Sequence, residues 1–198
     1  MRSEIPKRPQ LTLPEPAASL VREEYSKART ILEYGSGGST IEAAQSPGTT
    51  VFSVESDASW VGMMKEWFSF SPPKGTVHLH HVDIGPTKEW GYPINDAKWR
   101  AFIDYPFSVW TRPDFQHPDV ILIDGRFRVG CFLAVANKIQ KKTRILFDDY
   151  ADRPRYHSVE ALCKPTLLRG RLAVFDLKPE SLAFDDLNSI VKLLHQID

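Results

Sequence analysis

Four carboxylates follow β-rich runs in this chain, and a glycine-rich turn lies close to the first of them. Glu33 precedes the turn in EYGSGGST, Glu55 closes the run TVFSVE, Asp83 follows VHLHHV, and Asp124 follows VILI. In an open parallel sheet the carboxyl ends of the strands meet at one rim, which is where ligands bind. The sequence therefore predicts an acidic ligand-binding rim beside a glycine turn.

The turn can bring main chain close to a bound molecule, because Gly35 and Gly37 carry no Cβ. Ser39 and Glu42 form an S-x-x-E capping box, which predicts a helix that begins at Ser39 and points its free N–H groups at the turn. The turn lacks the lysine of a triphosphate-binding loop, and Thr40 stands where a dinucleotide fingerprint needs its third glycine. An NAD-dependent oxidoreductase therefore stays open only as the weaker alternative.

The spacing of the carboxylates indicates a ribose-containing ligand. Glu55 lies twenty residues after Gly35, where a carboxylate can accept both hydroxyls of a ribose. Asp83 ends the third predicted strand, where it could meet an adenine amino group. A rim this acidic suits a ligand with a ribose and a positive charge, and it suits a pyrophosphate badly.

The elements that position these residues alternate along the chain. Amphipathic helical stretches separate the β-rich runs, and DVILIDG is apolar without alternation, as in a strand that is covered on both faces. This pattern predicts one Rossmann-like α/β domain over residues 1–198, with a doubly wound, mostly parallel sheet and helices on both faces. The expected strands are 30–34, 50–55, 76–82, 119–123, 143–147 and 171–177, and the expected helices are 14–28, 39–44, 58–70, 130–141, 156–164 and 185–196.

One segment is too long for a simple crossover. About thirty-five residues separate the third and fourth strands, and they are rich in aromatic side chains and proline. Long ordered insertions in compact domains are often functional. We therefore expect the insertion, residues 84–118, to form a substrate cap beside the cleft, with a local cap that completes the core as the alternative.

Composition limits the classes of partner. The 25 basic and 25 acidic residues give a formal net charge of zero, so no overall field attracts nucleic acid. No apolar run is long enough to span a membrane, and the start MRSEIPKRPQ has no apolar stretch typical of a secretory signal. Cys131 and Cys163 have no partner at metal-ligand spacing, which favours reduced cysteines in a cytoplasmic protein.

The motifs EYGSGGST, VFSVESD, HHVDIG, DVILIDG and ILFDDY, in this order, resemble those of class I S-adenosylmethionine-dependent methyltransferases. The resemblance covers roughly residues 31–150 and implies a seven-stranded sheet whose last strand is antiparallel. It also implies that Gly35, Ser36 and Gly37 pass beneath the methionine and ribose of the cofactor. The other implied cofactor-binding residues are Glu33 near the methionine, Glu55 at the ribose, Asp83 at the adenine, and Asp124.

A narrower resemblance concerns a metal. Asp124, Asp148 and Asp149 are similar to the magnesium ligands of metal-dependent O-methyltransferases of the catechol and macrocin types. Mg²⁺ would hold a substrate hydroxyl and lower its pKa. The alternative is an arginine–carboxylate network, since several arginines lie close in sequence.

Basic residues follow the same strands. Arg126 and Arg128 could clamp a substrate carboxylate or phosphate, or they could neutralise Asp124 and Asp148. His157 is the best-placed histidine for a general base. The predicted catalytic residues are therefore Asp124, Arg126 and His157.

These observations lead to one expected function and one alternative from another class. We expect a cytoplasmic S-adenosylmethionine-dependent methyltransferase that acts on a hydroxyl of a small molecule or sugar, with Mg²⁺ as a second cofactor. The alternative is a methyltransferase-like protein that binds the nucleoside without catalysis. The aromatic insertion and the final helix could each serve a homodimer contact, and no nucleic-acid or membrane partner is expected.

Overall fold

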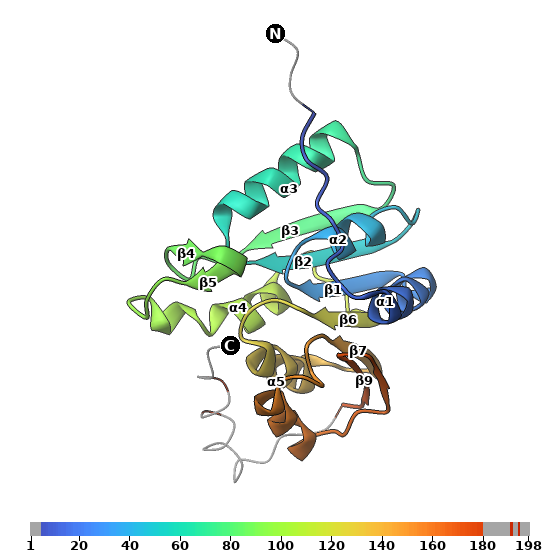
Figure 1. Cartoon of the computed structure of the whole chain (residues 1–198), viewed down its shortest axis with the longest axis vertical. Helices are drawn as coiled ribbons and strands as arrows, with labels where there is room; N and C mark the ends of the chain where they lie inside the picture. The colour runs from blue at the N-terminus through green and yellow to red at the C-terminus, as the bar shows by residue number, and fades with distance from the viewer. Residues whose placement is uncertain (1–4, 180–190, 192–193, 195–198) are drawn as a thin grey trace.

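A computed structural model of the chain describes residues 5–179, 191 and 194. Seven strands form one sheet in the order β3-β2-β1-β6-β7-β9-β8, and most of them follow one another across the sheet in Figure 1. The first five in this order run parallel, whereas β9 is antiparallel to both of its neighbours. The strands are β1 (Thr30–Tyr34), β2 (Thr50–Glu55), β3 (Thr76–His81), β6 (Val120–Ile123), β7 (Thr143–Phe147), β8 (Leu167–Arg169) and β9 (Leu172–Leu177).

Helices cover both faces of the sheet, as predicted. One core cluster joins one face of the strands to α1, and the other joins the opposite face to α5 and to part of the insertion. The helical elements outside the insertion are α1 (Glu15–Lys27), α2 (Gly38–Ala43), α3 (Ala58–Phe70), α5 (Arg128–Lys138) and the 3-10 helix η4 (Pro154–Ala161). In the described ranges, none of the helices has the length and apolar character needed to cross a bilayer.

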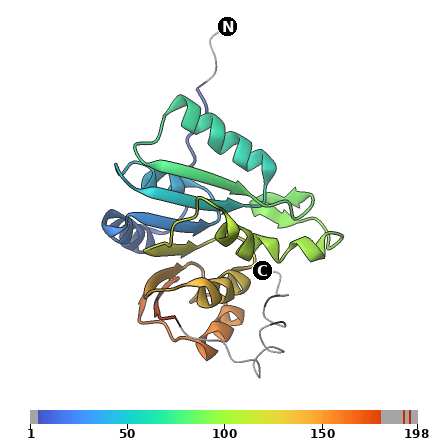
Figure 2. The same ribbon diagram turned by 180° about the vertical axis from the view of Figure 1, so that it is seen from behind.

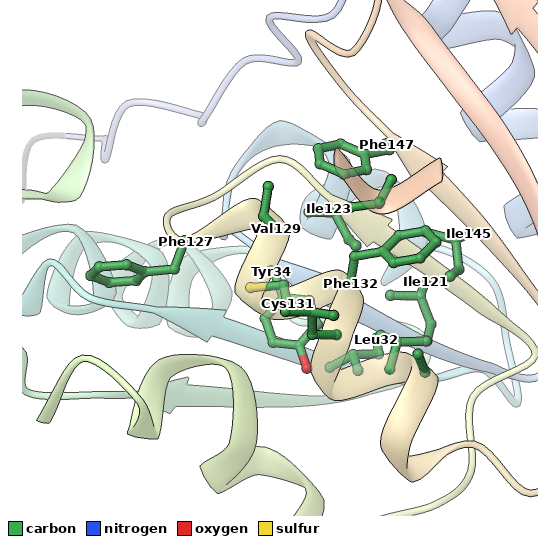
Figure 3. Close-up of a cluster of buried hydrophobic side chains, with 14 of the residues drawn as sticks. Leu32, Tyr34, Ile121, Ile123, Phe127, Val129, Cys131, Phe132, Ile145 and Phe147 are labelled. Atoms are coloured by element: carbon green, nitrogen blue, oxygen red, sulfur yellow. The ribbon is translucent and has the colours of Figure 1, made fainter. Parts of the chain in front are cut away.

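The core beneath α5 is built from large apolar side chains. Phe132 of α5 has no exposed surface, and Figure 3 shows it beside Ile121 and Ile145 of the sheet. Truncating a buried phenylalanine to alanine costs about 3–5 kcal/mol. This packing fixes the carboxyl ends of β6 and β7, where the candidate site residues lie.

The strand order reverses between β1 and β6, because the chain runs outward from β1 to β3 and then crosses back to β6. Gly35 N–H donates to the Val54 carbonyl at 2.8 Å, and Asp124 N–H donates to the Tyr34 carbonyl at 2.9 Å. The ends of three strands are therefore joined by main-chain hydrogen bonds. A crevice at such a reversal is the usual ligand site of this architecture.

The insertion divides into two halves. Its first half holds a short hairpin of β4 (Thr87–Lys88) and β5 (Tyr92–Pro93), joined by the 3-10 turn η1 (Glu89–Gly91). Its second half holds η2 (Trp99–Ala101), α4 (Asp104–Phe107) and η3 (Ser108–Thr111). Figure 2 shows the hairpin beyond the carboxyl ends of β2 and β3.

The second half of the insertion belongs to the core. Phe102, Tyr105 and Val109 are buried, and the Tyr34 hydroxyl donates to the Pro106 carbonyl at 2.7 Å. By contrast, Trp90 in the first half is 75% exposed. Part of the second half therefore completes the core, as in the local-cap alternative, and the role of the insertion as a substrate cap stays a prediction.

Several predicted boundaries differ from the structure. Strand β8 is exposed and too short for a periodic pattern, so the sequence did not indicate it, and the antiparallel strand of the family is β9 itself. The predicted helix 156–164 is the 3-10 helix η4, which begins at Pro154. The predicted closing helix, residues 185–196, lies outside the described residues except for positions 191 and 194.

The predicted capping box is also wrong. Helix α2 begins at Gly38, and the Thr40 hydroxyl accepts the Gly37 N–H at 2.9 Å. Glu42 instead pairs with Arg22 of α1, at 2.9 Å between Oε2 and Nε. Thr40 is therefore the residue that caps the turn.

Candidate functional site

The reason for glycine differs from one position of the turn to the next. Gly35 has φ +103°, and a Cβ there would lie 2.8 Å from the Gly125 nitrogen. A Cβ on Gly38 would overlap the main chain of Gln10 and Leu11. The fold itself therefore requires glycine at positions 35 and 38.

Gly37 is different. Its φ of 176° is extended backbone that any residue adopts, and a Cβ there would meet nothing within 4 Å. Neither backbone conformation nor packing within the described residues requires glycine here. The open space above Gly37 is the place where a ligand could lie against the turn.

The peptide of Ser36 is held firmly between the two glycines. Its N–H donates to Glu55 Oε2 at 3.2 Å, and its carbonyl accepts the Trp60 indole N–H at 2.7 Å. Its hydroxyl lies 2.7 Å from the Ser53 hydroxyl. The main chain and side chain of Ser36 thus hold the turn against β2 and α3.

Glu33 lies beneath the turn and has no exposed surface. Its carboxylate accepts from the hydroxyls of Tyr25 at 2.7 Å and Ser53 at 3.2 Å, and also from Thr40. Burial raises the pKa of Glu33, and these hydrogen bonds oppose that shift. The hydroxyls that Glu33 accepts from belong to α1, α2 and β2, and its place near the methionine of a cofactor stays a prediction.

Glu55 is at the end of β2, as predicted, and lies beside the turn. Its Oε1 accepts the N–H groups of Ser56 at 2.7 Å and Asp57 at 3.0 Å. Burial raises the pKa of Glu55, while the main-chain donors oppose the shift. A carboxylate can accept about four hydrogen bonds, so Oε2, which accepts the Ser36 N–H, can accept more.

Asp83 is a surface residue whose side chain is 63% exposed. It pairs with Lys98 of the insertion and accepts the Gly85 N–H at 2.9 Å. The partner lysine lowers the pKa of this carboxyl. Asp83 lies two residues beyond β3 at the same rim, so its proposed role toward an adenine stays a prediction.

The hairpin of the insertion packs directly on the end of β2. The Gly91 carbonyl accepts the Ser56 hydroxyl at 3.0 Å, and a Cβ on Gly91 would lie 3.1 Å from Glu55 Oε1. No pattern in the sequence singles out Gly91, because the contact joins residues that are far apart in the chain. The hairpin and Glu55 therefore form one local structure.

Asp148 and Asp149 follow β7 and meet arginines. The fully buried Asp148 carboxylate accepts from Arg171 through Nε at 3.0 Å and Nη2 at 2.7 Å. Asp149 pairs with Arg153 at 2.8 Å, Arg171 at 3.2 Å and Arg128 at 3.3 Å. Both carboxylates are therefore neutralised by guanidinium groups.

Asp124 completes this cluster from the end of β6. Its carboxylate lies 3.1 Å from Arg128 Nη2, and its side chain is 26% exposed. Burial raises its pKa to about 7; Arg128 opposes the shift, and the neighbouring Asp148 adds to it. A carboxyl with this pKa can exchange a proton near neutral pH.

The predicted magnesium site is not supported. In the part of the chain that the structure describes, no group of three histidine, cysteine, aspartate or glutamate side chains is arranged to hold a metal ion. Asp124, Asp148 and Asp149 face arginines, whose fixed positive charges lie next to the oxygens that a cation would need. The arginine–carboxylate network is therefore the interpretation that fits.

The two arginines after β6 have separate roles. Arg128 is 3% exposed and donates to the carbonyls of Gly125, Asp124 and Asp148, so it ties strand ends together. Arg126 is 6% exposed, and its guanidinium lies 3.8 Å from the centre of the Tyr92 ring. Arg128 also pairs with Asp124, as the neutralising interpretation expected. A catalytic or substrate-binding role for Arg126 stays a prediction.

His157 lies in η4, beyond β7. Its Nε2 lies 3.0 Å from the Tyr150 carbonyl, and its ring packs on the Tyr150 ring at a centroid distance of 4.7 Å. Nε2 must carry a proton to make that hydrogen bond, so only Nδ1 could accept one. Its role as a general base stays a prediction.

Comparisons with known proteins agree with this geometry. No protein-family model and no curated protein matches the sequence. A methyltransferase-like protein of Silicibacter pomeroyi DSS-3 has 47% identity, with 96% of this chain and 98% of that chain covered and a TM-score of 0.92.

Two more distant structures share the fold. The O-methyltransferase TomG of Streptomyces achromogenes, solved with S-adenosylmethionine, has 16% identity, coverage of 86% and 82%, and a TM-score of 0.53. An O-methyltransferase of Bacillus cereus, solved with S-adenosylhomocysteine, has 15% identity, the same coverage and a TM-score of 0.51.

The chain therefore belongs to the class I S-adenosylmethionine-dependent methyltransferase family. Its 47% identical relative is the methyltransferase-like protein of S. pomeroyi. This assignment sets aside the NAD-dependent oxidoreductase that the glycine turn alone left open.

Proposed function

We propose that the protein binds S-adenosylmethionine at the glycine turn and transfers its methyl group to a hydroxyl of a small molecule or sugar. The proposal rests on Gly37. Neither its backbone conformation nor its packing within the described residues requires a glycine there. The open space there adjoins Glu55, whose Oε2 can accept further donors. Two fold neighbours were solved with S-adenosylmethionine or S-adenosylhomocysteine, which supports the choice of ligand.

The chain's own residues divide the work of holding the nucleoside. The main chain of Gly35, Ser36 and Gly37 would carry the methionine and ribose, and Glu55 would accept the ribose hydroxyls. Glu33 acts from beneath, because it accepts from Thr40, which in turn holds the Gly37 N–H. Asp83 would reach the adenine from the end of β3.

When bound, S-adenosylmethionine supplies a methyl group that its sulfonium activates for in-line attack. The protein then has to orient the acceptor hydroxyl and remove its proton, and orientation alone can be worth an effective molarity of about 10⁵ M or more. Asp124 is our proposed proton acceptor, because it ends β6 beside the turn and its pKa is raised to about 7. His157 is the second candidate for this role.

The test is calorimetric titration with S-adenosylmethionine, S-adenosylhomocysteine and NAD. We expect the two sulfur nucleosides to bind and NAD not to bind. Gly37→Val should lower their affinity at least tenfold at an unchanged melting temperature, whereas Gly62→Val on the open side of α3 should leave the affinity unchanged. An unaltered affinity in Gly37→Val would sink the cofactor assignment.

The alternative of a binding protein without catalysis is favoured by one observation: both candidate proton acceptors are engaged, Asp124 with Arg128 at 3.1 Å and His157 Nε2 with the Tyr150 carbonyl at 3.0 Å. An assay with labelled S-adenosylmethionine and a panel of hydroxylated small molecules and sugars distinguishes the enzyme from the binding protein. Transfer of label to any acceptor supports the enzyme. Tight nucleoside binding without transfer across the panel supports the binding protein.

A further inference from the structure

We propose that the β4–β5 hairpin is a gate over the nucleoside site, and that Gly91 and Tyr92 form the latch that holds it closed. The proposal rests on the proposed function, because Glu55 is the expected ribose ligand. In this arrangement the hairpin must move off the end of β2 before a nucleoside can enter or leave.

Gly91 forms the first part of the latch. It is buried, its carbonyl accepts the Ser56 hydroxyl at 3.0 Å, and the same hydroxyl lies 3.4 Å from Glu55 Oε1. A Cβ on Gly91 would stand 2.7 Å from Ser56 Oγ and 3.1 Å from Glu55 Oε1. Only a residue without a side chain lets the hairpin approach the carboxylate this closely.

Tyr92 forms the second part. Its ring packs against the guanidinium of Arg126, which follows β6, with 3.8 Å between Cζ and the ring centre. Burial acts to raise the pKa of Tyr92, but the guanidinium groups of Arg126 and Arg153 outweigh it and lower that pKa. The hairpin is thus attached at the ends of both β2 and β6, on the two sides of the glycine turn.

The hairpin is not part of the main sheet. Its two strands pair with each other in a separate two-stranded sheet and not with the main sheet. Trp90 at its tip is 75% exposed and has φ 63°, a left-handed conformation that is strained for a bulky side chain. The next half of the insertion is anchored in the core through Phe102 and Tyr105, which gives the hairpin a fixed base.

A matched pair of glycine substitutions tests the latch. Gly85 and Gly91 both have positive φ, at +97° and +71°, so alanine strains the backbone at either position. A Cβ on Gly85 meets only the Lys98 side chain, at an ordinary 3.6 Å, whereas a Cβ on Gly91 pushes against Ser56 and Glu55. Gly91→Ala should therefore open the gate, and Gly85→Ala should not.

Stopped-flow binding of S-adenosylhomocysteine provides the first readout. In Gly91→Ala and Tyr92→Ala, both the association and dissociation rate constants should rise at least fivefold, while Kd changes less than threefold. Gly85→Ala, which leaves Gly91 and Tyr92 in place, should stay within twofold of the wild type. Unchanged rate constants in Gly91→Ala, or equal changes in Gly85→Ala, overturn the proposal.

Hydrogen exchange without ligand provides the second readout. The amides of Ser36, Ser56 and Asp57 donate to Glu55 under the hairpin, so they should exchange at least fivefold faster in Gly91→Ala than in Gly85→Ala. If S-adenosylhomocysteine does not bind the wild type, the proposed function fails. The exchange measurement then tests the latch without a ligand. Faster amide exchange in Gly91→Ala than in Gly85→Ala supports the latch, and equal exchange in the two variants overturns it.

Discussion

Asp148 and Arg171 form a two-point ion pair in which Nε–Oδ1 is 3.0 Å and Nη2–Oδ2 is 2.7 Å. The carboxylate has no exposed surface, while the arginine side chain is 29% exposed. The pair joins the end of β7 to the start of β9. The pair lies at the rim where the resemblance to metal-dependent O-methyltransferases suggested a metal. Removing the pair is therefore the most direct test of what stabilises this rim.

Arg171→Ala should destabilise the protein, because a buried carboxylate loses its two-point partner. Removing one partner of a fully buried pair costs about 3–5 kcal/mol. We expect about 2–3 kcal/mol here, since Arg171 is partly exposed and water screens the pair. Urea denaturation measures the change, with Arg169→Ala on the exposed strand β8 as the control. A loss below about 0.5 kcal/mol, the range of ordinary surface changes, would contradict the assignment.

Divalent metal should have no effect on the wild-type protein. A ligand that binds only the native state raises the melting temperature, and millimolar Mg²⁺ or Mn²⁺ should produce no such shift. In the double variant Arg153→Ala/Arg171→Ala, Asp148 loses its two-point partner and Asp149 keeps its contact with Arg128, so Mn²⁺ should give a rise that EDTA reverses. A metal-dependent rise in the wild type would restore the magnesium hypothesis.

Gly38→Ala should destabilise the fold, because its new methyl group would point at the N-terminal segment and not at the ligand site. The new methyl group would overlap the main chain of Gln10 and Leu11, and overpacking of this kind costs about 1–3 kcal/mol. Gly62→Ala is the matched control, because that helical glycine faces open space. The control should gain about 0.5–1 kcal/mol from helix propensity. Equal stability of the two variants by urea denaturation would refute the close approach of the N-terminal segment.

Acid should loosen the contact between β3 and the second half of the insertion. Burial and the neighbouring Arg112 lower the pKa of His80, whose Nε2 lies 2.8 Å from the Ser108 hydroxyl. Arg112 Nη1 lies 3.4 Å from the other ring nitrogen, and Asp114 and His78 complete the cluster. Neutral histidine is therefore the form that the folded state favours.

The sign of the pH dependence follows from that lowered pKa. The contribution of His80 to stability is present above its unfolded pKa of about 6.5 and is lost as the pH falls through the lower folded value. The melting temperature should therefore fall more steeply between pH 7 and pH 5 in the wild type than in His80→Asn. Parallel curves for the two proteins would show that His80 is not the titrating group.

The sequence predicted those features of the rim that depend on local pattern. Buried apolar runs located the strand ends, and the spacing from Gly35 located Glu55 beside the turn. The hydrogen-bond partners of Glu33 could not be predicted, because they depend on which elements pack against that face. Its hydroxyl donors come from α1, α2 and β2.

Contacts between distant residues were beyond local pattern. Gly91 lies thirty-five residues after Ser56, and its importance comes only from the approach of their atoms. Asp148 meets Arg171 across twenty-three residues that include the short strand β8. Aspartates near strand ends could either bind a metal ion or pair with arginines. The positions of Arg153 and Arg171 in the fold favour pairing with arginines.

The late position of Arg171 in the chain bears on when the ion pair can form during synthesis. Asp148 and Asp149 are synthesised before Arg171, so a nascent chain that stops short of β9 would bury Asp148 beside like charges and without its two-point partner. Arg128 and Arg153 are made earlier and can pair with Asp149, but the two-point partner of Asp148 exists only once the segment leading into β9 has been made. Arg171 therefore makes completion of the rim conditional on completion of the sheet, and incomplete chains should remain open and susceptible to proteolysis.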